Sequence, residues 1–212
     1  MSEDKVNQFY QDSVYCYKEE APFAAETYKE LIRGLMLRYP AAYESLMEIG
    51  CGTGFFLEKA LGLGYKDIIG FEPSIDCYKK APDFIKKYIV SDVYKPEILG
   101  DKKYDIAVSF HVWDHLGDPY STLISLIEKL KAGGHVLIVC HDVESWSAKL
   151  LGSYSPIFDI EHVYLFSRFT IRRLFEFVGL EVMEIGSLQN CYPLGYWMRM
   201  LPLGRQIESL FP

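Results

Sequence analysis

The feature that most constrains the fold is an alternation of short apolar runs with segments of helical periodicity. The apolar runs, each suited to a buried strand, occupy residues 45–49, 67–72, 87–92, 104–110 and 135–140. The helical segments between them occupy residues 54–62, 74–80 and 120–131, and Gly133 and Gly134 are expected to stop the last of them. Because parallel strands need a crossover connection, this order predicts an α/β fold with a doubly wound, mostly parallel Rossmann-like sheet covered by helices on both faces.

A loop with three alternating glycines follows the first apolar run in "MEIGCGTG", at Gly50, Gly52 and Gly54. In a parallel sheet, the loop that leaves the first strand beside a helix N-terminus is a ligand site. Glycines let such a loop turn sharply and approach a ligand without a Cβ in the way. A dinucleotide fingerprint would need glycine at Phe55, and a P-loop would need a lysine, so the spacing argues against both.

Two acids follow the next two apolar runs. Glu72, in "GFEPS", is placed to accept hydrogen bonds from a ribose diol. Asp92, in "VSDVY", comes at the same sheet edge and is placed to accept from an exocyclic amino group. The glycine loop and the two acids together indicate a nucleoside ligand.

With these motifs, the sequence resembles the class I S-adenosylmethionine-dependent methyltransferases in their small single-domain form. The resemblance covers residues 40–187 and rests on "MEIGCGTG", "GFEPS", "SDV", "YDIAVSFHVWDHLGDP" and "LKAGGHVLIV". It implies a methyltransferase enzyme with S-adenosylmethionine as its cofactor. The stretch "DIEHVYLFS" is similar to the branch with ubiquinone-type O-methyltransferases and nucleotide-sugar methyltransferases.

The resemblance also implies roles for the matching residues. The glycine loop would hold the methionine end, the acid of "GFEPS" the ribose, and "SDV" the adenine. The residues that leave the fourth run would close the methionine end. The implied cofactor-binding residues are Glu48, Gly50, Cys51, Gly52, Gly54, Glu72, Pro73, Asp92, Val93, Phe110 and His111.

The domain organisation follows from length and composition. A chain of 212 residues, 50% of them hydrophobic, can bury one substantial core, so residues 1–212 are expected to form a single methyltransferase domain. Within it we expect an N-terminal helical cover (1–40), a cofactor-binding core (41–142) and a substrate-side segment with a helix, a strand and a tail (143–212). This last helix is expected at about 168–178, capped by Ser167 or Thr170 and stopped by Gly179, and the strand is expected at 180–188. Family members usually end on an antiparallel strand, and residues 188–212 contain no convincing one, so this final strand is expected to be missing or replaced.

A general base is expected among the histidines that follow the strands. By analogy with sugar C-methyltransferases of the family, His162 is the expected base with Glu161 assisting it. An equally simple role for His162 is to anchor its segment by hydrogen bonding. The other candidate bases are His111, His115 and His141, and Asp114 and Asp142 are candidate orienting acids. No ligand spacing in the sequence requires a metal, so none is expected.

The net charge and the composition of the chain indicate which kinds of partner to expect. The net charge of −7 predicts no nucleic-acid partner and favours a small-molecule substrate, with O-methylation favoured by analogy. No apolar run is long enough for a transmembrane segment, although the tail "LQNCYPLGYWMRMLPLGRQIESLFP" suits peripheral membrane contact as well as plain packing. The oligomeric state is left open.

The number and spacing of the cysteines indicate the cellular compartment. They number five, an odd count without C-x-x-C spacing, which predicts reduced thiols and a cytoplasmic protein.

Two other functions are compatible with this pattern. One is a non-catalytic, methyltransferase-like binding or partner subunit, which the intact glycine loop and its two acids disfavour. The other is a same-fold enzyme such as a polyamine synthase, which needs acids to hold a polyamine. The only such acids after the fourth run are Asp114 and Asp118.

Overall fold

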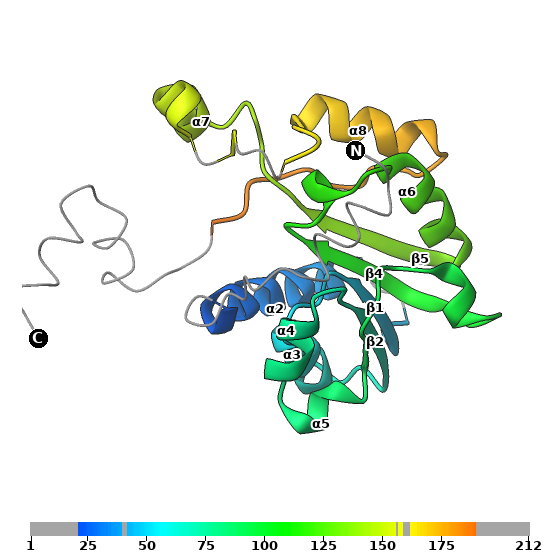
Figure 1. Ribbon diagram of the computed structural model, residues 1–212. Coiled ribbons are helices and arrows are strands. Elements are labelled where there is room, and N and C mark those ends of the chain that lie inside the picture. The colour runs from blue at the N-terminus through cyan, green and yellow to red at the C-terminus, as the bar shows by residue number, and fades with distance from the viewer. Residues whose placement is uncertain (1–20, 40–41, 156, 159–161, 190–212) are drawn as a thin grey trace, which may run out of the picture.

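The computed structural model describes residues 21–39, 42–155, 157–158 and 162–189 (Figure 1). Its strands are β1 (Ser45–Ile49), β2 (Asp67–Phe71), β3 (Ile89–Val90), β4 (Tyr104–Phe110) and β5 (Leu130–Val139). They form one sheet in the order β3-β2-β1-β4-β5, and each described pair of neighbours is parallel. The predicted α/β fold with a parallel sheet is therefore confirmed.

Helices cover both faces of this sheet. In Figure 1, α2 and α3 lie on one side of it, and α6 and α8 lie on the other. The α-helices are α2 (Ala21–Arg38), α3 (Phe55–Gly62), α4 (Ile75–Lys80), α5 (Asp83–Lys86), α6 (Pro119–Glu128), α7 (Trp146–Leu151) and α8 (Arg168–Phe177). The 3-10 helices are η1 (Pro96–Leu99), η2 (Trp113–His115) and η3 (Gly152–Tyr154).

The central strands β1 and β4 are buried along their whole length. Successive side chains of a strand point to opposite faces, so Leu46 packs in the cluster of α2 and α3, while Met47 packs in the cluster of η1 and α6. In β4, Val108 joins the first cluster and Ala107 the second. Burial on both faces explains why these strands appear in the sequence as continuous apolar runs.

Side-chain caps start the helices near the ligand edge. Asp118 accepts a hydrogen bond from the Ser121 backbone N–H (3.0 Å) at the first turn of α6. Ser167 and Thr170 form a reciprocal capping box at the start of α8. Gly179, with φ +86°, follows the end of α8, so the predicted start and stop of this helix are confirmed.

The structure differs from the sequence prediction in its last strands. Residues 180–188, predicted as a strand, form no helix or strand, because no described strand pairs with them. The fifth strand begins at Leu130 rather than at residue 135, and its pairing with β4 shifts register between Tyr104 and Ile106. The glycines Gly133 and Gly134, expected to stop a helix, therefore lie inside a strand.

Two findings bear on the predicted compartment. Cys51 and Cys140 are free, whereas Cys77 is disulfide-bonded, so the prediction of reduced thiols is wrong at Cys77. Among the described residues, no helix combines the length and apolar character that a membrane span requires. The cytoplasmic location stays a prediction, and the tail that was considered for membrane contact lies almost entirely outside the described residues.

At the opposite edge from the ligand loop, Asp105 ties three strands together. Its Oδ2 accepts hydrogen bonds from the backbone N–H of Glu44 (3.0 Å) and of Ser45 (2.8 Å), and from Ser45 Oγ (2.8 Å). Lys131 Nζ lies 2.9 Å from Asp105 Oδ1. Burial acts to raise the pKa of Asp105, but the hydrogen bonds from Lys131, Ser45 and Glu44 outweigh it and lower the pKa.

We expect Asp105→Asn to lower the free energy of unfolding by about 2 kcal/mol, because the amide cannot accept all of these bonds. A pKa lowered by folding stabilises the native state above the unfolded pKa, about 3.9, and this contribution is lost as the pH falls through the folded pKa. Urea unfolding of wild type and variant should therefore differ most near neutral pH and converge in acid. Asp101→Asn, at an exposed position, is the control, and equal losses in both variants would contradict the role of Asp105.

Candidate functional site

The glycine loop joins β1 to α3 with a left-handed backbone at every second residue. The φ angles are +75° at Gly50, +54° at Gly52 and +75° at Gly54. A Cβ at Gly50 would lie 2.2 Å from Val112 Cγ2, and one at Gly54 would lie 2.3 Å from an Ile85 methyl group. At Gly52 the nearest atom is 3.4 Å away, on the Phe55 ring. The outer glycines therefore allow close packing, and the middle one leaves room for a ligand.

Glu72, directly after β2, holds this loop. Its Oε2 accepts the Gly52 N–H, and its Oε1 accepts the Ser74 N–H, both at 2.8 Å. Burial raises the pKa of Glu72, and these two hydrogen bonds act in the opposite direction. Each carboxylate oxygen has a further lone pair for a ribose hydroxyl, so the residue fits its predicted role.

Glu48, at the end of β1, is a buried carboxyl group beside the same loop. Its Oε2 has no hydrogen-bond partner among the described residues. Burial, and then the nearby Glu72 carboxylate, raise the pKa of Glu48 well above its ordinary value. A buried acid without a partner at a glycine loop fits the ammonium group of a methionine. The fit of S-adenosylmethionine therefore rests on residues that this chain presents.

The residues predicted to contact adenine and to close the methionine end lie along the same edge of the sheet as the glycine loop. Asp92 Oδ1 accepts from the Val93 N–H (2.8 Å), and Asp92 Oδ2 pairs with Lys95 (2.5 Å), so its contact with adenine stays a prediction. Phe110 is buried and stacks on Tyr28 of α2, with ring centroids 4.0 Å apart. Helix α2, the first described helix, therefore packs directly against the end of β4.

The remaining predicted cofactor residues are His111, Cys51 and Pro73. His111 has a φ of +54°, and burial, with the neighbouring His141 ring, lowers its pKa to about 4, so its imidazole is neutral. Its Nδ1 is buried without a partner among the described residues. Burial raises the pKa of Cys51, which keeps this thiol protonated. Pro73 is half-buried between Glu72 and the α4 cap.

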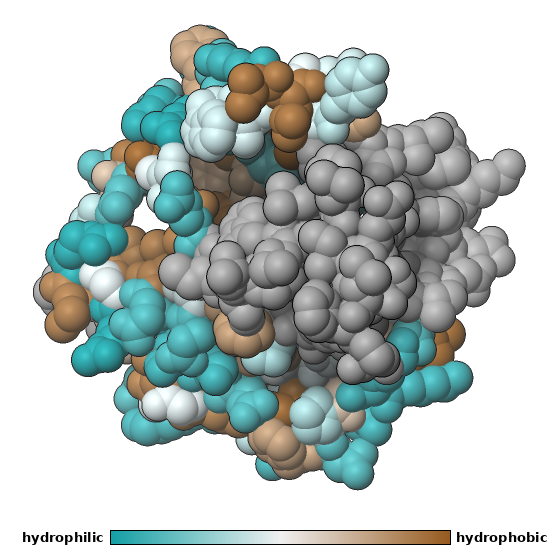
Figure 2. All heavy atoms as spheres, turned by 90° about the vertical axis from the view of Figure 1, so that its left-hand side faces the viewer, coloured by the Kyte–Doolittle hydropathy of each residue, from teal (hydrophilic) through white to brown (hydrophobic). Residues whose placement is uncertain are grey.

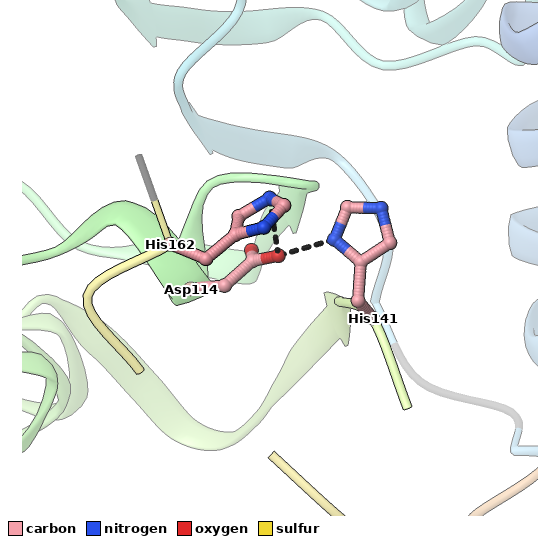
Figure 3. Close-up of side chains that lie close together, drawn as sticks. All are labelled: Asp114, His141 and His162. Carbon is pink, nitrogen blue, oxygen red and sulfur yellow. Dashed lines mark hydrogen bonds and ion pairs between the residues drawn. The ribbon is translucent and has the colours of Figure 1, made fainter. Parts of the chain in front are cut away.

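A second group of side chains, Asp114, His141 and His162, lies where β4 and β5 end (Figure 3). Asp114 belongs to η2 after β4, His141 follows β5, and His162 precedes α8. His141 Nδ1 donates a short hydrogen bond to Asp114 Oδ2, and His162 Nε2 lies 3.6 Å from the same oxygen. We call these three residues the Asp-His-His cluster.

Backbone contacts hold the three segments of the cluster together. The Tyr164 N–H donates to the Asp114 carbonyl (3.0 Å), and His162 Nδ1 donates to the Ile157 carbonyl (2.8 Å). The Val143 N–H donates to the Phe166 carbonyl (2.9 Å). The segment before α8 is therefore bound both to η2 and to the chain that leaves β5.

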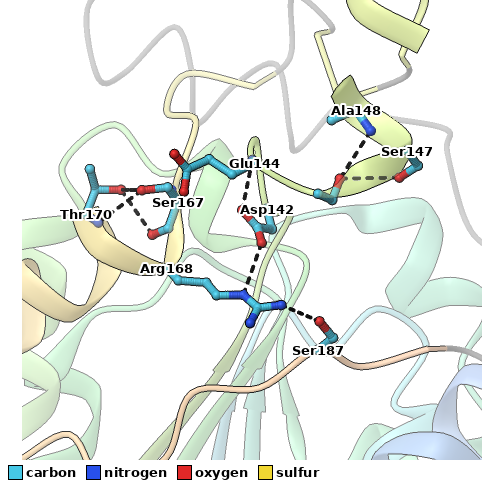
Figure 4. Close-up of polar contacts among 9 residues, drawn as sticks. Asp142, Glu144, Ser147, Ala148, Ser167, Arg168, Thr170 and Ser187 are labelled. Atoms are coloured by element: carbon cyan, nitrogen blue, oxygen red, sulfur yellow. Dashed lines mark hydrogen bonds and ion pairs between the residues drawn. The ribbon is translucent and has the colours of Figure 1, made fainter. Parts of the chain in front are cut away.

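Side chains around Asp142 brace this junction (Figure 4). Asp142 accepts the Glu144 N–H (2.9 Å) and Arg168 Nε (3.3 Å). Arg168 also donates to Ser187 Oγ (2.5 Å) beyond α8. The predicted orienting acid Asp142 thus positions the α8 segment, and among the described residues no hydrogen bond or ion pair joins its carboxylate to the cluster.

Asp114 is the electrostatic centre of the cluster, with its side chain 2% exposed. Burial acts to raise its pKa, but the hydrogen bond from His141 and the charge of His141 outweigh it, so the pKa lies below its usual value. Further imidazoles surround it: the His111 and His141 rings are 4.8 Å apart, and those of His115 and His162 are 4.7 Å apart. Such a group can orient an imidazole, remove an acceptor proton or bind a cation.

Of the predicted catalytic pair, the structure describes His162 but not Glu161. His162 lies in the cluster, but both of its ring nitrogens face oxygen acceptors, so neither is directed at an acceptor substrate. Glu161 lies outside the described residues, and Asp114 is the carboxylate that the structure places beside His162. Of the two cluster imidazoles, His141 is the one whose Nε2 has no hydrogen bond among the described residues, and its side chain is 34% exposed. The role of His162 as a base stays a prediction.

The cluster as a unit was missed by sequence reasoning. Its members are separated in the chain, and the stretch around each carries no ligand spacing. The available signal was that Asp114 and His141 each follow the end of a predicted strand, so that adjacent parallel strands bring them together.

A comparison with protein families finds a match to the family described as a methyltransferase domain, over residues 22–185. The matched region spans β1 to β5 together with α2 and α8. This match confirms the predicted resemblance to class I S-adenosylmethionine-dependent methyltransferases, and with it the methyltransferase assignment and the cofactor.

Curated relatives share part of their length with this chain. A tRNA U34 carboxymethyltransferase of Campylobacter fetus subsp. fetus is 28% identical over 151 residues, 68% of this chain and 53% of the relative. An uncharacterized methyltransferase of Schizosaccharomyces pombe is 26% identical over 160 residues, 65% of this chain and 55% of the relative. The chain therefore spans about half the length of these relatives.

Solved structures support the fold. The plantazolicin methyltransferase BpumL, in complex with a monoazolic desmethylPZN analog and SAH, has a TM-score of 0.66 at 20% identity. That alignment covers 99% of this chain and 85% of the other. A chain from the complex of the Haloferax volcanii Trm112 methyltransferase activator with a methyltransferase has a TM-score of 0.55 at 20% identity, covering 85% and 86%.

The relatives correct one prediction. Several of them carry a tRNA substrate in their name, so the prediction of a small-molecule partner and no nucleic acid is contradicted. The physical reason is that the net charge of −7 is a sum over the whole chain, whereas nucleic-acid contact depends on the local distribution of charge.

We expect Glu72→Gln to weaken S-adenosylmethionine binding about tenfold or more, because a charge-assisted acceptor for the ribose is lost. Isothermal titration calorimetry would measure the affinity, and circular dichroism would confirm that the variant is folded. Glu58→Gln, at an exposed position on α3, is the matched control and should bind like wild type. Unchanged affinity in Glu72→Gln would remove the ribose assignment.

Proposed function

The chain belongs to the methyltransferase-domain family, and from this premise we propose that it transfers a methyl group from S-adenosylmethionine to an oxygen of an RNA acceptor. The observation that carries the proposal is the position of two groups at the carboxyl edge of one sheet. The cofactor cradle follows β1 and β2, and the Asp-His-His cluster follows β4 and β5. The cofactor and the acceptor would thus meet at the centre of this edge.

In this proposal the cradle and the cluster have separate tasks. Bound S-adenosylmethionine supplies an electrophilic methyl carbon, whose C–S bond breaks with its electrons left on sulfur as the C–O bond forms. Glu48, Glu72 and the glycine loop hold the donor in place, so its methyl group is presented at a fixed position. The acceptor hydroxyl gives its proton to an imidazole of the Asp-His-His cluster, and its oxygen lone pair forms the new bond.

The acceptor class is supported by the exposed surface of α7 and η3, which follow the cluster residue His141 in the chain. Trp146 of α7 is 74% exposed and Tyr154 of η3 is 91% exposed, and Lys149, between them in the chain, is exposed as well. Figure 2 shows hydrophobic side chains at the top of this face, where α7 lies in Figure 1. Exposed aromatics beside cations suit stacked bases and phosphates of single-stranded RNA. The names of the tRNA-modifying relatives point to the same class.

A transfer assay tests the reaction. We expect the chain, given methyl-labelled S-adenosylmethionine and total tRNA, to transfer label to RNA, and mass spectrometry to identify a methyl rather than a carboxymethyl group. Asp114→Asn should slow transfer by about a hundredfold while it retains cofactor affinity, because the cluster loses its charge.

The control for this assay is Glu144→Gln, an exposed change close to the cluster that should leave the rate unaltered. Cofactor binding without label in any RNA would overturn the proposal and favour a non-catalytic binding subunit.

A separate measurement tests the acceptor surface. Trp146→Ala should weaken tRNA binding about tenfold, since stacking of one base on an aromatic ring contributes about 1–3 kcal/mol. Fluorescence anisotropy with labelled tRNA, at several salt concentrations, would give the affinity. Phe84→Ala, at an exposed aromatic of α5, is the control. Equal tRNA affinity for wild type and Trp146→Ala would exclude α7 from the contact.

A further inference from the structure

We propose that Asp114, His141 and His162 bind a divalent first-row transition-metal ion, of the class that includes Zn²⁺, Co²⁺ and Fe²⁺. Each residue offers one ligand atom, and these atoms all lie within 4.8 Å of one another (Figure 3). Ligand atoms at about 2.0–2.2 Å from a shared ion lie roughly 3–3.5 Å apart. The separation of 3.6 Å between His162 Nε2 and Asp114 Oδ2 is close to this range. His141 Nδ1 and Asp114 Oδ2 lie closer together than this, as hydrogen-bond partners, so a bound ion would replace that hydrogen bond and separate the two atoms.

The orientation of His162 supports a cation between the side chains. Its Nδ1 donates to the Ile157 carbonyl at 2.8 Å, so in the tautomer that carries its proton on Nδ1 the Nε2 lone pair faces Asp114 Oδ2. Two acceptor atoms that face each other require a proton or a metal ion between them. Metal-binding histidines commonly donate their other N–H to a backbone carbonyl, which is the arrangement at Ile157.

The environment of Asp114 gives an independent argument. Its carboxylate is buried, and its Oδ1 has no hydrogen-bond partner among the described residues. In the described part of the chain, its ion pairs are with His141 and His162 and include no lysine or arginine. Because a buried carboxylate without full compensation is costly, a bound cation would stabilise this site.

The ligand set determines the kind of metal. Imidazoles suit zinc, iron and the other late first-row ions, whereas Mg²⁺ and Ca²⁺ prefer oxygen ligands. Three protein ligands also leave at least one coordination position open, as in catalytic rather than structural sites. No metal was expected from the sequence because these ligands come from three segments that only the fold brings together.

The role of the ion rests on the proposed function, although the binding site itself does not. At the open position, the ion would hold the acceptor hydroxyl oxygen and lower its pKa, so that with the ion bound the proton would leave to solvent instead of to a cluster imidazole. The charges of the Asp114 carboxylate, the divalent ion and the resulting alkoxide sum to zero. The alkoxide would then be the nucleophile for the methyl group.

Cobalt titration tests the site without relying on turnover. We expect chelator-treated wild type to bind one Co²⁺ per chain with visible absorption bands, and Zn²⁺ but not Mg²⁺ to displace it. Asp114→Asn and His162→Gln should each lose this binding by tenfold or more. His135→Ala is the control, because His135 of β5 stacks on Tyr43 away from the cluster.

Folding of the variants would be checked by circular dichroism and by retained S-adenosylmethionine binding. If both cluster variants misfold, the melting temperature of the wild-type protein with and without Zn²⁺ tests the site instead. A ligand that binds only the native state must raise the melting temperature, so no rise with Zn²⁺ would overturn the proposal. Unchanged Co²⁺ affinity in a folded Asp114→Asn would also overturn it. RNA methylation without metal binding would reject the metal site alone, and metal binding without RNA methylation would reject the proposed function alone.

Discussion

Burial of both faces of β1 and β4 is the constraint on which the rest of the structure depends. Because these strands are parallel and central, their carboxyl ends meet at one edge, and every loop that leaves them opens toward the same space. The glycine loop after β1 and the Asp-His-His cluster after β4 and β5 are consequences of that arrangement. The helices that cover the two faces fix how far apart these groups lie.

The buried acids at the two ends of the sheet differ in how fully their charge is compensated. At the amino end, Asp105 accepts several hydrogen bonds and pairs with Lys131, so its charge is compensated within the chain. At the carboxyl end, Glu48 and Asp114 each keep a buried oxygen without a described partner. Since uncompensated buried acids are costly, their concentration at one edge indicates groups that ligands complete.

Prediction from sequence succeeded where one local property decided the outcome. The continuous apolar runs at 45–49 and 104–110 are buried strands, and Ser167 starts α8 as expected, because apolar periodicity and capping are local signals. It failed at residues 180–188, where an apolar alternation has no partner strand in the described structure. It also failed on the start of β5, since a register shift against β4 depends on the neighbouring strand.

The cofactor could be predicted from sequence alone, because the glycine spacing and the acids Glu72 and Asp92 form a local pattern, while the individual roles of these residues stay predictions. The family match agrees with that conclusion. The tertiary structure alone decided which carboxylate meets which imidazole, since His141 and Asp114 are distant in the chain and adjacent only through β4 and β5. A side chain's partner across a sheet edge depends on strand order, which no local pattern encodes.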